Sequence, residues 1–225
     1  MVSLAAAMVS VMILTYQYRL LPSKRQHRAL EALLESQRQL YNAALEERIG
    51  AYRRGVTRGY VDQTKALTEW RRSDAEAALV PVNLQRATLK RLDEAYKGFF
   101  RRVKRKAAKA GFPRFRGKGW WDSFGFREFA GVSFDGGRLR FKGMPGALRV
   151  HVHRPLGGDR RIRSCTFRRD TKGWTVGFAV EAEAAVPRTG ERTVGVDLGI
   201  TRFAALSDGG FIQAAHVREQ AQGPH

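Results

Sequence analysis

The stretch TVGVDLGI occupies residues 193–200 and carries one carboxylate, Asp197, at the end of a run of apolar residues. A second apolar run, RFAALS, follows at residues 202–207. The residues DGG at 208–210 then mark a tight turn before a third short run, Phe211-Ile212. We therefore expect a strand that delivers Asp197 at its end, followed by a hairpin.

A strand, an aspartate and a hairpin in this order are how an RNase H-like fold presents its first metal-binding carboxylate. Two-metal hydrolysis needs several acidic ligands that hold two cations about 4 Å apart. Asp208 lies in the turn and Glu219 in a polar tail, so neither is a convincing second ligand for Asp197. GVDLG also resembles the first phosphate loop of sugar kinases and actin-like ATPases, but that alternative requires Ser or Thr where Ile200 stands.

Basic residues outnumber acidic residues by almost two to one. The 225 residues include 41 Lys and Arg against 21 Asp and Glu, which gives a net charge of +20 and a pI near 11.1. Excess positive charge opposes compaction unless a partner balances it, and contact with phosphates releases condensed counterions. The composition therefore indicates a polyanionic partner.

The single cysteine and the sequence of the amino terminus argue against a disulfide-bonded, zinc-binding, membrane-spanning or secreted protein. Cys165 is the only cysteine, so the chain can form neither an intramolecular disulfide nor a zinc site that needs two or four cysteines. Residues 1–14 carry no charge, are too short to span a bilayer and lack the basic start of a signal peptide. We expect translation to begin at Met12, residues 1–11 to be a non-native extension, and the protein to be cytoplasmic, without a membrane partner.

Three zones follow one another along the chain. The first is helical, because Ser23 and Gln26 have the spacing of a capping box and apolar residues recur with helical spacing over residues 30–49. Further helices are expected at residues 63–78 and 83–111. The second zone is a set of short strands typical of a small barrel, expected at residues 123–129, 132–134, 139–141, 148–152, 162–168 and 174–181. The third is the unit around Asp197.

The segment FFRRVKRKAAKAGFPRFRGKGWW, residues 99–121, contains no acidic residue. Cations that follow a phosphate backbone and flat rings that stack on bases are the usual groups of a nucleic-acid groove. The alternative places the rings in the core and leaves the cations in solvent. The candidate nucleic-acid-binding residues are Arg101, Arg102, Lys104, Arg105, Lys106, Lys109, Arg114, Arg116 and Lys118, interleaved with Phe112, Phe115, Trp120 and Trp121.

The barrel zone shows the same excess of cations. Arg149 and Arg154 are the candidate nucleic-acid-binding residues there, beside His151 and His153. Two histidines without a third ligand are a weak indication of a metal, so a basic solvent-exposed face is favoured. A further basic cluster comprises Arg160, Arg161, Arg163, Arg168 and Arg169.

Taken in order, these segments resemble the TnpB, or OrfB, proteins of bacterial insertion sequences. YQYRLLP at residues 16–22 is similar to the family's first strand, which precedes a helix-turn-helix. YNAALEER at residues 41–48 is similar to its Tyr-Asn-x-Ala-Leu element, and LDEAYKGFFRR at residues 92–102 to its Leu-Asp-x-Ala-Phe-x-x-Phe-Phe segment. The match continues through GFPRF, DSF, GWTV, VGVDLG and SDGG, at residues 111–115, 122–124, 173–176, 194–199 and 207–210.

The resemblance implies an RNA-guided nuclease related to compact type V CRISPR effectors. The implied fold class is α+β, with a helical lobe inserted into a small wedge-type β-barrel and followed by an incomplete RNase H-like (RuvC) β unit. The implied divisions are a first barrel strand at residues 12–22, a helical recognition lobe at 23–111, the barrel at 112–187 and the start of the RuvC domain at 188–225. Guide RNA and double-stranded target DNA would be the partners, in the prokaryotic nucleoid.

The departures from the family concern its catalytic apparatus. Asp197 would be the first of three catalytic carboxylates that hold Mg²⁺ in the complete site, but the chain ends at His225, before the other two and the zinc ribbon. We expect no stable metal at Asp197 and no cleavage by this chain alone. Two alternatives stay open. One is a nuclease-free module that binds RNA or DNA, and the other is the N-terminal half of a split nuclease completed by a downstream polypeptide.

Overall fold

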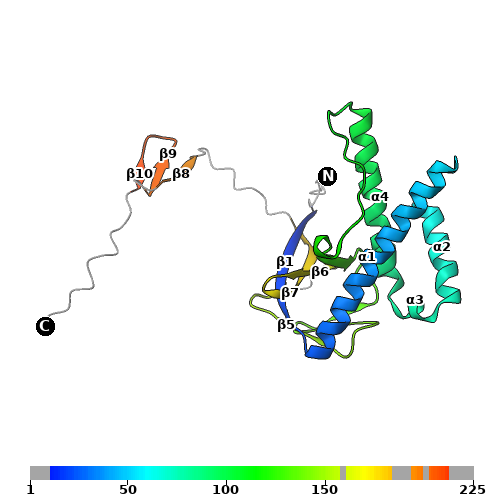
Figure 1. Ribbon diagram of the computed structural model, residues 1–225. Coiled ribbons are helices and arrows are strands. Elements are labelled where there is room, and N and C mark those ends of the chain that lie inside the picture. The colour runs from blue at the N-terminus through cyan, green and yellow to red at the C-terminus, as the bar shows by residue number, and fades with distance from the viewer. Residues whose placement is uncertain (1–10, 158–160, 184–193, 200–202, 213–225) are drawn as a thin grey trace, which may run out of the picture. The chain divides into compact units, whose positions relative to one another are not determined.

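The structure is a computed structural model that describes residues 11–157, 161–183, 194–199 and 203–212 (Figure 1). The chain divides into two compact units, Met1–Ala184 and Ala185–His225. Among the described residues, the first unit holds four α-helices and a seven-stranded sheet, and the second a three-stranded sheet. No helix in the described ranges is both long and apolar enough to cross a membrane.

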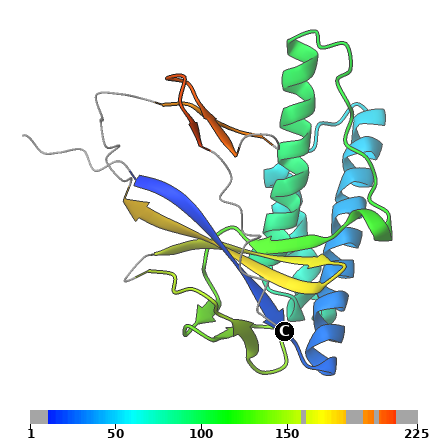
Figure 2. The ribbon, with the colours of Figure 1, turned by 90° about the vertical axis from the view of Figure 1, so that its left-hand side faces the viewer.

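The large sheet is antiparallel and curled, with β1 at its centre (Figure 2). Its strand order is β2-β6-β7-β1-β5-β4-β3. The edge strands β2 and β3 do not pair with each other, so the expected small barrel is a half-barrel. The strands are β1 (Val11–Leu21), β2 (Ser123–Phe126), β3 (Val132–Phe134), β4 (Arg138–Phe141), β5 (Leu148–His151), β6 (Ile162–Asp170) and β7 (Gly173–Glu183).

Alternation of apolar and polar residues gives this sheet one buried face. Tyr18 of β1 pairs with Val176 of β7, which pairs with Phe167 of β6 and then Phe124 of β2, and all four side chains are buried. The neighbouring row carries Arg19, Thr175 and Arg168 on the opposite face, because side chains alternate along a strand.

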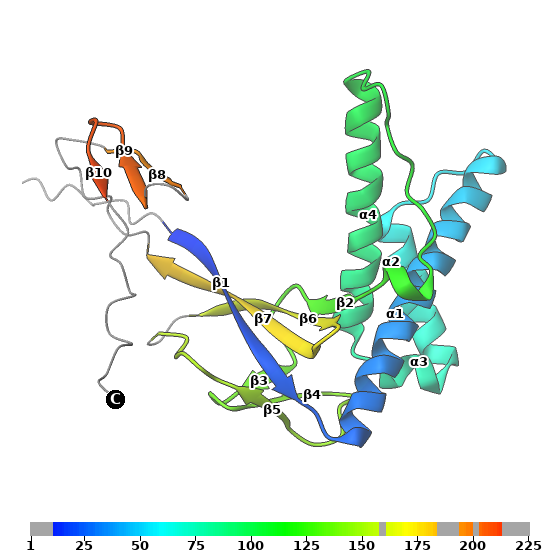
Figure 3. The same cartoon turned by 60° about the vertical axis from the view of Figure 1, so that its left-hand side comes forward.

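The four helices lie between β1 and β2 in the sequence and beside the sheet in space (Figure 3). Their bounds are α1 (Lys24–Arg53), α2 (Tyr60–Ser73), α3 (Ala75–Leu79) and α4 (Val82–Lys104). The capping box predicted at Ser23 and Gln26 is confirmed, since each side chain binds the other residue's backbone N–H. Leu30 and Leu92 belong to the same buried cluster as the sheet residues, so helices and sheet share one core.

Two helix predictions were wrong in extent. The helix expected at residues 63–78 begins at Tyr60 and breaks at Asp74, whose carboxylate accepts a hydrogen bond from Ala77 N and starts α3. The helix expected to end at residue 111 ends at Lys104. Lys106 adopts a φ of 51°, in the left-handed region, and this turns the chain back one residue after the helix cap.

The second unit is a small antiparallel sheet with β9 in the middle. It consists of β8 (Val196–Leu198), β9 (Ala204–Leu206) and β10 (Phe211–Ile212). The predicted strand and hairpin are therefore present. Asp197 is the middle residue of β8, opposite Ala205, rather than at the strand end as expected, because the ladder with β9 continues through Leu198.

Candidate nucleic-acid interface

The basic segment predicted at residues 99–121 forms a hairpin of helix and extended chain, here called the basic hinge (residues 101–118). Its first part is the last turn of α4, and its second part returns beside α4 toward α1 (Figure 2). Phe112 packs edge-on against Phe99 and Tyr96 of α4, with ring centroids 5.2 and 5.5 Å apart. These contacts hold the returning chain against the helix.

Two arginines of the basic hinge hold the turn together. Arg102 donates from Nε to the carbonyl of Ala110 and from Nη2 to the carbonyl of Gly111. Arg116 is half-buried, and its guanidinium carbon lies 6.0 Å from the centroid of the Tyr41 ring. The sequence pattern grouped these two with the nucleic-acid-binding cations, but in the structure their guanidinium groups stabilise the hinge.

The other seven predicted cations of the basic hinge are exposed. None of them has a side-chain hydrogen bond or an ion pair to any residue that the structure describes. A cluster of cations without a counter-charge repels itself, and contact with phosphates would relieve this repulsion. These residues are Arg101, Lys104, Arg105, Lys106, Lys109, Arg114 and Lys118.

The four aromatic residues of this segment divide between core and surface. Trp121 is buried and packs against Tyr41 of α1, with ring centroids 5.1 Å apart. Phe115 and Trp120 are exposed, Trp120 to 80%, and Phe112 is half exposed beside α4. Trp120 and Phe115 are therefore the rings that could stack on a base beside the unpaired cations.

The cations of the sheet mostly have acidic partners. Arg163 pairs with Glu181 at 3.0 Å, Arg168 with Asp122 at 3.2 Å, and Arg169 with Glu31 of α1. Arg161 is exposed, and Arg160 lies outside the described residues. The sequence showed the charges of this cluster but not their partners.

Arg149 and Arg154, the two predicted binding residues of the sheet, have no ion pair among the described residues. Arg149 is exposed and lies directly opposite Arg138 of β4. Arg154 is exposed, with its guanidinium carbon 4.8 Å from the centroid of the Tyr16 ring. The His151 and His153 rings lie 6.4 Å apart, and no group of three metal-ligating side chains occurs in the described parts of the chain.

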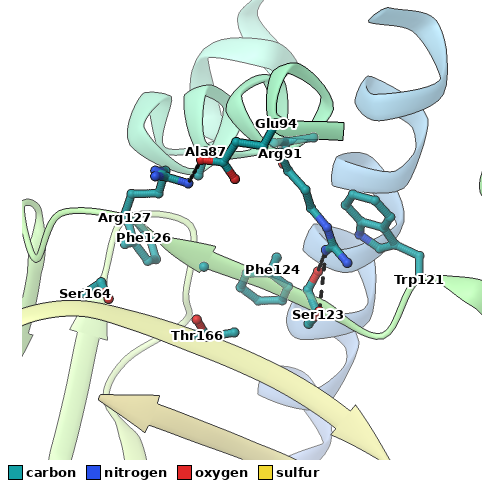
Figure 4. Close-up of a pocket in the computed structure, with 12 residues that line it drawn as sticks. Ala87, Arg91, Glu94, Trp121, Ser123, Phe124, Phe126, Arg127, Ser164 and Thr166 are labelled. Carbon is teal, nitrogen blue, oxygen red and sulfur yellow. Dashed lines mark hydrogen bonds and ion pairs between the residues drawn. The ribbon is translucent and has the colours of Figure 1, made fainter. Parts of the chain in front are cut away.

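A groove of about 470 Å³ separates α4 from the edge strand β2 and its neighbour β6 (Figure 4). Arg91 of α4 lies over the Trp121 ring at 4.2 Å and donates from Nη1 to the Ser123 carbonyl at 3.2 Å. Glu94, one turn further along α4, pairs with Arg127 at 2.8 Å. The groove is therefore polar along its α4 side and aromatic at Trp121.

The floor of this groove depends on close approach of two strands. A Cβ atom on Gly125 of β2 would lie 2.6 Å from the Cys165 carbonyl oxygen and 3.1 Å from the Thr166 Cα. Position 125 therefore requires glycine, because any Cβ atom would overlap the backbone of β6. Sequence reasoning missed Arg91 and Arg127, because only the fold brings α4 beside β2.

Asp197 is an exposed residue in the middle of β8. The residues described around it supply no second and third ligand, since no group of three His, Cys, Asp or Glu side chains is found in them. Asp208 Oδ1 accepts a hydrogen bond from Gly210 N at 3.0 Å, so this carboxylate serves the turn. One exposed carboxylate cannot offset the repulsion between two divalent ions, so these residues do not fit the Mg²⁺ pair of the complete family site.

Comparisons with known proteins find relatives of the kind that the sequence motifs predicted. A helix-turn-helix domain model of IS605-type OrfB proteins matches residues 8–56. The "Putative RNA-guided DNA endonuclease" of Streptomyces pristinaespiralis is 29% identical over 199 residues, which cover 86% of this chain and 48% of that protein. The "Putative RNA-guided DNA endonuclease InsQ" of Escherichia coli K12 is 26% identical over 200 residues, 86% of this chain and 47% of that protein. These matches confirm the predicted resemblance to the TnpB/OrfB family. It spans about half the length of these curated relatives.

The match to the family's helix-turn-helix model confirms the predicted resemblance of this segment, but the structure shows a strand and a single helix here rather than two helices joined by a turn. The described residues within 8–56 form β1 and then α1, which runs without a break from Lys24 to Arg53. Gln26, the partner of Ser23 in the capping box, also donates to the carbonyls of Pro145 and Ala147 at 3.0 Å. The start of α1 is therefore fixed to the loop that leads into β5.

Proposed function

We propose that this chain is the nucleic-acid-binding part of a transposon-encoded, RNA-guided DNA endonuclease of the OrfB type. It binds guide RNA and double-stranded target DNA and does not cleave DNA by itself. The observation that carries this proposal is a set of seven exposed cations that have no ion pair within the described part of the chain. They lie on a hinge whose backbone is fixed by Arg102, Phe112 and α1. The names of the two relatives supply the class of nucleic acid.

A fixed backbone makes the basic hinge suitable for this role. Binding orders the long side chains of Lys and Arg and so costs rotamer entropy. The backbone that carries them is already ordered by its contacts with α4 and α1, so binding does not have to order it as well. The two exposed rings, Phe115 and Trp120, lie within or next to the same segment as the cations. Arg149 and Arg154 would add contacts at the sheet.

We propose further that β8, β9 and β10 are the start of a RuvC nuclease domain, with Asp197 as the first catalytic carboxylate. This interpretation rests on the strand and hairpin that follow the motif VGVDLG. Because the carboxylates described here do not fit a metal pair, no cleavage step is assigned to this chain. A second polypeptide that supplies the remaining ligands would make it half of a split nuclease.

The binding proposal is tested by the salt dependence of RNA affinity. Arg101→Gln, Lys104→Gln and Arg105→Gln together should reduce the slope of log affinity against log salt by about 0.7 to 0.9 for each phosphate that the hinge no longer neutralises. The control combines Arg140→Gln, Arg163→Gln and Arg168→Gln, which removes the same charge from ion-paired positions. Its slope should stay close to that of the wild type. Equal slopes for the hinge variant and the wild type would refute contact between the hinge and phosphate.

The cleavage proposal is tested with magnesium or manganese, guide RNA and a matched duplex. The wild-type chain should give no more product than Asp197→Ala. Cutting by the wild type but not by Asp197→Ala would show that a carboxylate partner exists. If cutting appears only after a downstream polypeptide is added, the split nuclease is the correct interpretation, and Asp208→Ala should then retain activity, because Asp208 serves the turn.

A further inference from the structure

The C-terminal ends of α1 and α4 enclose a second hollow, distinct from the groove beside β2. Both helices run toward the same side of the first unit (Figure 3). The hollow has a volume of about 560 Å³, within the range of pockets that enclose a small organic molecule. Its apolar wall includes Tyr52, Val56, Phe99, Phe100, Val103 and Phe112.

Two aromatic side chains of this wall are far more exposed to solvent than side chains in a protein core. Tyr52 is 82% exposed and Phe100 60%. Phe100 lies 5.1 Å from Phe99 and 6.2 Å from Tyr96 between ring centroids, so one side of the ring is supported by α4. Contiguous exposed apolar residues rimmed by polar groups mark binding sites. The supported rings therefore present ordered flat surfaces to a ligand.

A buried donor lines the same hollow. The side chain of Arg48 is 7% exposed, and its guanidinium carbon lies 5.0 Å from the centroid of Tyr96. Its Nε donates to Gln63 Oε1 at 2.8 Å, but Nη2 has no hydrogen bond among the described residues and lies 3.6 Å from Asp93 Oδ1. Asp93 thus gives this nitrogen an ion pair but no hydrogen bond, and an acceptor atom of a ligand could supply the hydrogen bond.

The two helices that bound the hollow both end in positive charge, and Arg53 lines the hollow itself. Arg53 and Arg54 end α1, and Arg101, Lys104 and Arg105 end α4. All five are exposed and have no ion pair among the described residues. Arg58 is partly offset by Glu47 at 3.5 Å. The occupant must therefore combine a flat apolar group, an acceptor at its edge and negative charge beside it.

We propose that this hollow takes an unpaired nucleobase of a single-stranded RNA, with the adjacent phosphates on the arginines and lysines at the two helix ends. The inference rests on the proposed function and adds a stacking site to it. A base supplies the flat surface for Phe100 and Tyr52, and its ring nitrogens and carbonyls are acceptors for Arg48. A second copy of the chain is disfavoured, because a symmetric contact would bring these five cations against themselves.

The test uses a uridine-rich single-stranded RNA with one central 2-aminopurine, whose emission is quenched on stacking. The wild-type chain should bind it and quench the emission. Phe100→Ala and Tyr52→Ala should each weaken binding by about 5- to 150-fold and restore emission. The salt slope should not change, because no charge is removed. Phe100→Tyr should keep both quenching and affinity.

Phe203→Ala is the matched control, since Phe203 is 56% exposed and belongs to the other unit. It should bind as the wild type does, and thermal unfolding should show that all variants fold. Salt-dependent binding that Phe100→Ala and Tyr52→Ala leave unchanged would overturn the stacking site while the proposed function stands. No binding by the wild type would overturn both. Dimerisation that Phe100→Ala abolishes would assign the hollow to a second copy instead.

Discussion

Asn42 of α1 holds the backbone of Arg116 at both of its polar groups. Its Oδ1 accepts from Arg116 N at 2.8 Å, and its Nδ2 donates to Arg116 O at 3.0 Å. Arg38 donates to the same carbonyl at 2.7 Å and pairs with Glu35. One side chain thus replaces a strand partner for the returning half of the basic hinge.

Asn42→Ala should loosen this segment without changing its charge. The variant would lack two hydrogen bonds of about 0.5 to 1.5 kcal/mol each. Hydrogen exchange should show weaker protection of the Arg116 amide, and urea unfolding should show a lower free energy of unfolding. Asn83→Ala is the control, since Asn83 makes one exposed hydrogen bond, to the Ala130 carbonyl at 3.2 Å. Unchanged protection at Arg116 would contradict the role assigned to Asn42.

Gly125→Ala should destabilise the protein by about 1 to 3 kcal/mol, because the new Cβ would overlap a backbone carbonyl that cannot rotate away. Gly177→Ala is a matched control on β7. Its Cβ would lie 3.7 Å from Thr15 Cγ2, an ordinary contact. Chemical denaturation of the two variants measures the difference, and equal stabilities would mean that β2 can shift away from β6.

Asp93 should give α4 an acid-sensitive cluster of ion pairs with Lys90 and Lys97. Burial by itself would raise the pKa of Asp93, but hydrogen bonds from Lys97 and Lys90 outweigh it and hold this pKa below its ordinary value. The stabilisation is therefore present above the unfolded pKa, near 4, and is lost as the pH falls through the lower folded pKa.

Asp93→Asn should therefore lower the free energy of unfolding at pH 7, by about 1 to 3 kcal/mol, and the difference from the wild type should shrink in acid. Glu94→Gln, one residue further on, removes an exposed pair with Arg127 and should cost less than about 1 kcal/mol. Urea unfolding of the wild type and both variants, at pH 7 and in acid, measures these differences in the free energy of unfolding. A difference for Asp93→Asn that persists in acid would exclude the ionised carboxylate as its source.

Cys165 should behave as an inert thiol. Burial raises its pKa to about 12, so the native thiol stays protonated at pH 8 while the unfolded thiol begins to ionise. Labelling by a maleimide should therefore be slow and should rise with urea in step with unfolding. Any contribution to stability is complete below the unfolded pKa and is lost as the pH rises toward 12. Rapid labelling of folded protein would show that β6 opens locally.

The sequence predicted those parts of the fold in which the contacting residues are only a few positions apart. Ser23 and Gln26 are three residues apart, so the start of α1 follows from the sequence. Asp135 accepts hydrogen bonds from Gly137 N and Arg138 N, which makes the turn between β3 and β4 equally local. The break at Asp74 was not predicted, although its cause is also local, because the Asp74 carboxylate accepts a hydrogen bond from Ala77 N and starts α3.

The candidate site was predicted less completely, because ion pairing joins distant residues. Arg169 and Glu31 are 138 positions apart, and Arg168 and Asp122 are 46 apart. A count of cations could not separate these from the unpaired Arg101 and Lys104. Only the fold shows which charges are already satisfied and which remain for a ligand.

The central position of β1 has a consequence for the order of synthesis. β1 pairs with β5 and β7, so about 150 residues must be added after Leu21 before β7 exists. At roughly 5 to 20 residues per second, the apolar strand VMILTYQYRLL would wait about 8 to 30 s for that neighbour. The helices rest on local contacts and can form in this interval. A ribosome that stalls before Gly173 would therefore release a chain with a formed helical part and an open, aggregation-prone strand.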